Sequence, residues 1–360
     1  MLSHLKVLAP RGRGRPRALG AMVCGVVALG VCACGSGSTD SSGQTASTGP
    51  AAVKIDNVGS AGLPGGANIA GKTVLWNYQT DASDSTGIPM LNGAKAAAAL
   101  TGLKLDVEYG NNDDSTQVTQ IHNAVAKKDA GFAVSVPDGG LNSAMCAAHA
   151  TGAPVVMFNT NGLTGKSRAC ADAYIGQSYT SAGKLIAEYM ISKGLIKKGD
   201  KVFCPVELPS NSYAVQRKEG VEEALAPLGI QCDELGTGTD LGSAKNSIVQ
   251  YLLGHHDTNA IIALGGTPLA VLPEALKQAG LTVPVGGFDL SYPQIVDGIK
   301  DGTIAASVNQ ELYAQGFYAI MEIALDLKYD IPPANVNTSN DALLTKQNVG
   351  TFAPLVPNYQ

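Results

Sequence analysis

The sequence has 360 residues, of which 45% are hydrophobic and 15% charged, and its formal net charge is −5. A chain of this length exceeds the size at which one hydrophobic core keeps growing, so two lobes are expected. The small acidic excess gives no electrostatic basis for binding nucleic acid, which requires a clustered basic surface. The arginines of residues 11–17 do not change this, because they belong to a segment that is expected to be removed.

The N-terminal residues have the composition of an export signal. Four arginines between residues 11 and 17 precede an apolar run at residues 18–31. That run is shorter than the roughly 20 residues needed to cross a bilayer, and no later apolar run of the sequence reaches that length. Residues 1–33 are therefore predicted to be a signal peptide.

The signal ends in a motif with small residues directly before a cysteine. Residues 29–34 read LGVCAC, which resembles the lipobox of bacterial lipoproteins. The resemblance implies cleavage before Cys34, acylation of its thiol, and a protein held by lipid on the extracytoplasmic side of the cell membrane, at the cell surface or in the periplasm. Cys32 is the poorer candidate because the bulkier Val31 precedes it, and a signal peptide with an incidental cysteine is the alternative.

A polar segment separates this cysteine from the rest of the chain. Residues 34–70 are rich in Gly, Ser, Thr and Ala and contain few large apolar side chains. Such a composition cannot bury enough apolar surface to fold, so it predicts a flexible tether. A tether of this kind would hold a domain near the membrane without fixing its orientation.

Four cysteines follow the tether, an even number that suits disulfides in an oxidising compartment. They are Cys146, Cys170, Cys204 and Cys232. Three pairings are possible, and Cys146–Cys170 with Cys204–Cys232 is favoured because each bond would join neighbouring elements within one lobe. Free buried thiols are the alternative. No Cys/His spacing indicates zinc, and neither a metal nor another cofactor is expected.

From residue 72 onward, strand-like apolar runs alternate with helical patterns. The first series predicts strands at 73–78, 103–109, 131–136 and 154–159, and helices at 88–100, 116–127 and 141–151. The second predicts strands at 201–206, 229–235, 260–264 and 283–289, and helices at 213–228, 244–253 and 269–279. Short continuous apolar strands are typical of parallel sheets covered on both faces. The predicted fold is therefore α/β, with two doubly wound parallel-sheet lobes.

The two series share one sequence pattern. Each has an apolar strand, a Gly-Gly turn, a helix, and a second strand that ends in an aromatic and a polar residue, Phe158-Asn159 in one and Phe288-Asp289 in the other. Ligands of open α/β sheets bind beyond the carboxyl ends of the strands. Asn159 and Asp289 are therefore expected on facing walls of one cleft between the lobes.

The sequence carries no convincing catalytic motif. No Gly-x-Ser-x-Gly segment supplies a nucleophile elbow. Residues 160–167 end like a phosphate-binding loop but begin with Thr160 where glycine is needed. The pair His255-His256 lies among turn-forming residues, where a surface role is expected. The chain is therefore predicted not to be an enzyme, although carboxylate pairs for glycoside hydrolysis stay open because their spacing is spatial.

Three segments in order carry a family resemblance. They are NSYAVQRKEGV at residues 211–221, GFD at 287–289 and ASVNQ at 306–310. Together they resemble the type I periplasmic binding proteins of bacterial ABC sugar importers, typified by ribose-binding protein, over roughly residues 72–347. The resemblance implies that Arg217, Asp289 and Gln310 contact sugar hydroxyls.

The chemistry of these side chains suits a hydroxyl-rich ligand. Asp289 can accept two hydroxyl protons, and Arg217 donates through a planar fork. Asn159 and Gln310 offer a donor and an acceptor each. Other roles stay open: Arg217 on a helix surface, Asp289 as the N-cap of the next helix, Asn159 as a turn cap, and Gln310 as a hydrogen-bonding residue of the hinge.

The loop after the first predicted strand departs from the ribose-binding pattern. Ribose-type receptors carry paired aromatics there, whereas residues 79–89 contain none. Stacking on a sugar ring would have to come from Trp76, Tyr78 or Tyr213, and a strand-core role is favoured for Trp76. Asp84 in this loop suits a polyol or a less planar monosaccharide, or else it only forms a solvated turn. The departure puts ribose itself in doubt.

The sequence thus predicts a lipid-anchored, monomeric solute-binding protein that closes on a small neutral carbohydrate and delivers it to the permease of an ABC transporter. The N-terminal lobe is predicted at 71–177 plus 311–333 and the C-terminal lobe at 178–310 plus 334–360, joined by a three-stranded hinge. The predicted ligand-binding residues are Asp84, Asn159, Tyr213, Arg217, Asp289 and Gln310. The alternative is a receptor of the same fold that presents a sugar or signal molecule to a membrane kinase or chemoreceptor.

Overall fold

Two six-stranded sheets organise the chain in the computed structural model, which describes residues 66–162, 170–338 and 343–352. The first sheet has the order β11-β5-β4-β3-β1-β2 and is parallel throughout. Its strands are β1 (Thr73–Tyr78), β2 (Lys104–Tyr109), β3 (Gly131–Val136), β4 (Val155–Asn161), β5 (Ala173–Gly176) and β11 (Val336–Asn337). The predicted signal peptide, Cys34 and all but the last residues of the predicted tether lie outside the described residues.

The second sheet repeats this arrangement in the order β12-β10-β9-β8-β6-β7. All its pairs are parallel except β10 with the short strand β12. Its strands are β6 (Val202–Val206), β7 (Cys232–Gly236), β8 (Ala260–Ile262), β9 (Val285–Phe288), β10 (Ala306–Val308) and β12 (Leu343–Leu344). The predicted fold class, two parallel-sheet α/β lobes, is confirmed.

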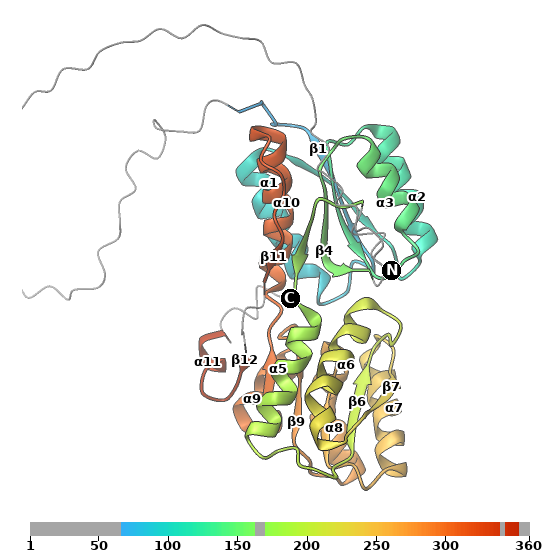
Figure 1. Cartoon of the computed structure of the whole chain (residues 1–360), viewed down its shortest axis with the longest axis vertical. Helices are drawn as coiled ribbons and strands as arrows, with labels where there is room; N and C mark the ends of the chain where they lie inside the picture. Colours follow the sequence, from blue (N-terminus) through green and yellow to red (C-terminus); the bar gives the residue numbers. More distant parts are fainter. Residues whose placement is uncertain (1–65, 163–169, 339–342, 353–360) are drawn as a thin grey trace, which may run out of the picture. The chain divides into compact units, whose positions relative to one another are not determined.

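Helices cover both faces of the first sheet, as Figure 1 shows. One face packs on α1 (Gly87–Thr101) and α10 (Leu312–Tyr329), and the other on α2 (Asp114–Lys127) and α3 (Asn142–Ala150). Side chains alternate along β1: Val74 and Trp76 face the α1–α10 side, while Leu75 faces the α2–α3 side. Burial on both faces explains why these strands are continuous apolar runs in the sequence.

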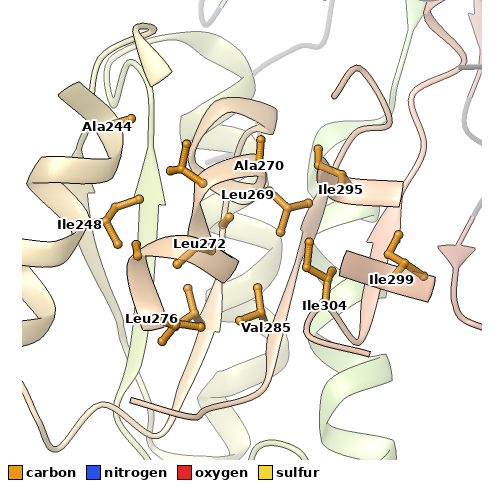
Figure 2. Close-up of a cluster of buried hydrophobic side chains, with 14 of the residues drawn as sticks. Ala244, Ile248, Leu269, Ala270, Leu272, Leu276, Val285, Ile295, Ile299 and Ile304 are labelled. Atoms are coloured by element: carbon orange, nitrogen blue, oxygen red, sulfur yellow. The ribbon is translucent and has the colours of Figure 1, made fainter. Parts of the chain in front are cut away.

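The second sheet is covered in the same way. Helices α5 (Tyr179–Ser192) and α6 (Ser212–Leu225) pack on one face, and α7 (Leu241–Gly254), α8 (Gly266–Ala279) and α9 (Pro293–Asp301) on the other. Figure 2 shows aliphatic side chains of α7, α8, α9 and β9 pointing toward one another in the hydrophobic core between the second sheet and these three helices. A short helix, α11 (Val349–Phe352), lies against α9.

All the strands and helices predicted above are present, with ends that move by up to a few residues. One such difference lies between α6 and β7, where the sequence favours a helix up to residue 228 and a strand from 229. The α-helix ends at Leu225 and continues as a 3₁₀ turn, Ala226–Leu228. Pro227 lacks the N–H needed to extend an α-helix, and Gly229 then reverses the chain at φ 68°.

The predicted lobe boundaries need two corrections. The last residues of the predicted tether, 66–70, instead pack on the first lobe, because the N–H of Ala67 donates to the carbonyl of Lys328 at 2.8 Å and Ile69 is buried there. The chain leaves the N-terminal lobe for the last time after Asn337 rather than after residue 333, because β11 pairs with β5 in the first sheet. Residues 334–338 therefore belong to the N-terminal lobe.

Two disulfides, Cys146–Cys170 and Cys204–Cys232, occur in the pairing that the sequence favours. The first ties α3 to the segment before β5, and the second joins the neighbouring strands β6 and β7. Each bond lies within one lobe and therefore leaves the crossings between lobes free. None of the helices in the described part of the chain is long and apolar enough to cross a bilayer.

Replacing Cys204 and Cys232 together by alanine is expected to lower the free energy of unfolding by about 2–4 kcal/mol. The two cysteines are 28 residues apart, so the bond restricts a sizeable loop of the unfolded chain. Urea titration of the oxidised wild type and of the double variant measures the difference. Coincident unfolding curves would contradict the prediction.

Candidate functional site

A cavity of about 560 Å³ lies where the carboxyl ends of both sheets meet. Its volume is in the range of small-molecule sites. Its walls come from the β1–α1 loop of the N-terminal lobe and from the loops after β6, β8 and β9 of the C-terminal lobe. All six residues predicted to bind the ligand line it: Asp84, Asn159, Tyr213, Arg217, Asp289 and Gln310.

Arg217 lies on α6 and is only 1% exposed, so it is not a residue of the helix surface. Its Nε and Nη2 donate to Oε1 of Gln177 at 3.1 and 2.8 Å, and its Nη1 donates to the carbonyl of Leu264 at 2.7 Å. The guanidinium carbon lies 4.1 Å from the centre of the Phe288 ring. These contacts use three of the five N–H groups of the guanidinium. The other two have no partner among the described residues and are available to a ligand.

Asp289 follows β9 and is 2% exposed. Its Oδ1 accepts from the N–H of Leu290 at 3.2 Å and the hydroxyl of Ser291 at 3.0 Å, and its Oδ2 accepts from Nε2 of Gln310 at 2.7 Å. Burial raises the pKa of Asp289, and the positive charge of Arg217 opposes that rise. Asp289 does not cap the next helix, because the N-cap of α9 is Tyr292.

Asn159 lies near the end of β4, on the opposite lobe from Asp289. Its backbone has φ 59° and that of Asp289 has φ 94°, so both residues turn the chain in the left-handed region that Asn and Asp tolerate best. The Nδ2 of Asn159 donates to Oε1 of Gln315 at 3.0 Å, and its carbonyl accepts from the hydroxyls of Tyr174 and Tyr179. The end of β4 is therefore held firmly against the hinge.

Gln310 combines the two roles left open by the sequence. Its side chain reaches Asp289 in the cavity. Its carbonyl accepts from Nε2 of Gln315 at 2.9 Å and from the hydroxyl of Thr338 at 2.8 Å, which joins two of the chain crossings. A change at Gln310 would therefore act on the cavity and on the hinge at once.

Asp84 is occupied by its own loop. Its Oδ2 accepts from the hydroxyls of Tyr78 at 2.9 Å and Thr80 at 2.6 Å, and its Oδ1 accepts from the N–H and hydroxyl of Thr86 at 3.0 and 2.9 Å. A carboxylate has about four acceptor positions, so these donors use them all. Asp84 thus shapes the loop that forms the N-terminal wall.

The aromatic residues divide between core and cavity. Trp76 is fully buried and stacks on Phe158 with ring centres 5.2 Å apart, so it belongs to the core. The tyrosines at the cavity are Tyr78, Tyr179, Tyr213 and Tyr292. Burial raises the pKa of Tyr179 to about 12, so its hydroxyl stays protonated and donates to the carbonyl of Asn159.

Glu207 is a cavity residue that the sequence analysis missed. It directly follows β6, and its Oε2 accepts from the hydroxyl of Tyr213 at 2.9 Å while its Oε1 accepts from the N–H of Thr267 at 2.8 Å. Burial raises the pKa of this carboxyl group as well. The rule that identified Asp289, a polar residue directly after a parallel strand, would have found Glu207 too.

The lobes touch beside the cavity. The N–H of Ser212 on α6 donates to the carbonyl of Pro137 at 3.0 Å, and Nε2 of Gln216 donates to Oδ1 of Asn161 at 2.9 Å. Over residues 66–162, 170–338 and 343–352, no group of three or more His, Cys, Asp or Glu side chains could hold a metal ion.

Two α/β lobes enclosing a polar cavity at the carboxyl ends of their strands define a two-lobed ligand-binding protein. The resemblance drawn from the three sequence segments points to the same class. The chain belongs to the periplasmic binding protein domain family, whose model matches residues 78–328. This membership confirms the prediction that the chain is a binding protein and not an enzyme.

Several known proteins are similar to this chain. The xylose/arabinose-binding protein XylF of Sulfolobus acidocaldarius is 24% identical over 303 residues, which cover 78% of this chain and 72% of that protein. A carbohydrate transporter from Acidothermus cellulolyticus 11B in complex with myo-inositol has 24% identity and a TM-score of 0.73 over 81% of this chain and 100% of its own. A solute-binding protein from Burkholderia graminis C4D1M in complex with D-arabinose has 23% identity and a TM-score of 0.70, covering 78% and 98%. At such identities these structures establish the fold.

Proposed function

We propose that the protein is an extracytoplasmic solute-binding protein that captures a small neutral carbohydrate, a monosaccharide or polyol, and delivers it to the permease of an ABC transporter. The observation that carries this proposal is that one cavity is lined by hydrogen-bonding groups of both lobes, Asn159 from one and Arg217 with Asp289 from the other. The sugars and the inositol named for XylF and the two solved structures support the ligand class.

Each side chain of the cavity has its own proposed role in ligand binding. Arg217 donates its two remaining N–H groups to ligand oxygens, and Asp289 accepts from ligand hydroxyls. Asn159 and Gln310 contact hydroxyls from the other lobe and from the hinge. Tyr213 supplies an aromatic wall, whereas Asp84 acts through the shape of its loop.

Ligand capture works through lobe closure. A ligand that contacts both lobes stabilises the closed arrangement by its difference in affinity for the two states. The contacts of Ser212 with Pro137 and of Gln216 with Asn161 add protein–protein hydrogen bonds to that arrangement. The disulfides, which stay within the lobes, do not oppose the motion.

The predicted lipid at Cys34 completes the proposal. An exported chain anchored there, with a polar tether up to about residue 65, would stay close to a membrane permease. We propose that it acts as a monomer.

A thermal-shift screen of pentoses, hexoses and polyols tests the ligand class. A ligand at a hundred times its Kd stabilises the folded protein by about 2.7 kcal/mol, which raises the melting temperature by several degrees. The absence of a shift with every carbohydrate would refute the proposed function.

Asp289→Asn is expected to weaken binding of the carbohydrate found in that screen by about tenfold to a hundredfold while the protein stays folded. Asparagine tolerates the positive φ of this position, and its amide oxygen can still accept from Leu290 and Ser291. The charged acceptor offered to the ligand is lost. Isothermal titration calorimetry measures the affinity, and wild-type affinity of the variant would remove Asp289 from the proposed site.

A further inference from the structure

The cavity has an unbalanced charge. Only one basic side chain, Arg217, is found among the described residues that line it. The acidic residues at its walls and rim are Asp81, Asp84, Glu207, Asp240 and Asp289. A cavity built only for uncharged hydroxyls does not require such an excess of carboxylates.

The carboxylate of Glu207 packs directly against the backbone of Gly265. A Cβ atom at Gly265 would lie 1.7 Å from Oε2 of Glu207, so the carboxylate fits only because residue 265 has no side chain. Tyr213 and Thr267 each donate one hydrogen bond, one to each oxygen of the carboxylate. About two of its four acceptor positions therefore remain for a ligand.

Glu207 and Asp289, the two carboxylates inside the cavity, have one positively charged side chain near them, Arg217. Within the described residues Arg217 forms no ion pair with Glu207 or Asp289. Burial raises the pKa of both carboxyl groups, and the positive charge of Arg217 offsets only part of that rise. Partly uncompensated carboxylates in a desolvated site favour a ligand that brings a positive charge.

The rim of the cavity is negatively charged as well. Asp81 in the β1–α1 loop and Asp240 at the start of α7 come from opposite lobes. Hydrogen bonds from Ser83 lower the pKa of Asp81, and those from Ser243 lower the pKa of Asp240, so both are ionised at neutral pH. Such a rim attracts cations and repels anions on their way into the cavity.

We propose that Glu207 is a specificity-determining residue that makes the cleft select carbohydrates by charge. Neutral sugars bind, protonated amino sugars bind more tightly with the ammonium group at Glu207, and sugars that carry a carboxylate or phosphate are rejected. This inference rests on the proposed function as a carbohydrate site and narrows its ligand class.

The test is calorimetry on the whole protein at pH 7 and low ionic strength with matched probes. D-Glucose, D-galactose and D-mannose are compared with their 2-amino-2-deoxy analogues and with D-glucuronate and D-galacturonate. We expect at least one amino sugar to bind about tenfold or more tightly than its parent sugar, with a preference that falls as salt is added. The uronates should show no binding at concentrations where the parent sugars bind.

Glu207→Gln keeps the size of the side chain and the acceptor for Thr267 but removes the charge. It should reduce the amino-to-neutral affinity ratio to about one, and this ratio rather than the affinity for the neutral sugar alone is the measure of the charge effect. Gly265→Ala should displace the carboxylate and lower the ratio in the same way. Asp240→Asn, at the rim, keeps an N-cap and should leave most of the preference intact.

The outcomes separate the two proposals. Binding of a neutral sugar without a preference for its amino analogue, or an unchanged ratio in Glu207→Gln, would overturn the role of Glu207 and leave the proposed function standing. No binding of any sugar would overturn both.

Discussion

Replacing Arg217 by alanine is expected to weaken carbohydrate binding by at least about a hundredfold and to lower the free energy of unfolding by about 2–4 kcal/mol. The binding loss follows from removing the two N–H groups of this cavity-lining side chain that are left for ligand oxygens in our proposal. The stability loss follows because Gln177 and the carbonyl of Leu264 lose their donor inside the protein, and each unsatisfied buried group costs about 1–3 kcal/mol.

Lys218→Ala is the matched control on the same helix. Lys218 is partly exposed, and its Nζ lies 3.4 Å from Oε2 of Glu234 in a surface ion pair. Exposed pairs of this kind contribute about 0–1 kcal/mol, so stability should change little and affinity should not change. Calorimetric titration and urea unfolding of both variants measure the two effects. An Arg217→Ala protein with wild-type affinity would contradict the proposed site.

Apart from Asp84 in the β1–α1 loop, the cavity residues that the sequence identifies belong to regular elements or lie within two residues of the end of one. Arg217 lies in a helix with a recognisable motif, and Asn159 and Asp289 lie where apolar strands end. Thr267 in the first turn of α8 and Tyr292 at the N-cap of α9 reach the cavity only because the starts of these two helices meet there. No local pattern encodes that meeting, so these two residues could not be assigned from the sequence.

The same contrast holds for the fold. A continuous apolar run such as β3 can be recognised by its composition, and an amphipathic segment such as α2 by the period of its apolar residues along the chain. The strand β11 has two residues and no period, so its membership of the first sheet depends on pairing with β5, far away in the sequence. The error in the lobe boundary at 334 arises from this strand.

Close helix packing is a second feature that repeats in both lobes. In the N-terminal lobe, a Cβ on Gly316 of α10 would lie 1.8 Å from the carbonyl oxygen of Met90, and one on Gly93 of α1 would lie 2.0 Å from that of Tyr313. In the C-terminal lobe, a Cβ on Gly220 of α6 would lie 1.9 Å from the carbonyl oxygen of Thr180. Glycines thus let one pair of helices in each lobe approach backbone to backbone.

In the C-terminal lobe this close approach also sets the position of Arg217. A Cβ on Gly183 of α5 would lie 2.1 Å from the carbonyl oxygen of Arg217 itself, and Gly220 is one turn further along α6. The spacing of an arginine three residues before a glycine therefore has a physical reason. The glycine brings α6 against α5, and the arginine one turn earlier is held at the depth where it meets Gln177 and the cavity.

Gly220→Ala is accordingly expected to lower the free energy of unfolding by about 3–5 kcal/mol and to weaken carbohydrate binding in the protein that remains folded. The added methyl group meets backbone atoms of Thr180, which cannot rotate away as a side chain could, so α6 must move and carry Arg217 with it.

Gly254→Ala, at the last position of α7, is the matched control. No atom lies within 4 Å of a Cβ there, and the substitution should stabilise the protein by up to about 1 kcal/mol. Urea unfolding and calorimetry on both variants decide the matter, because equal stability of the two proteins would show that α5 and α6 do not depend on this contact.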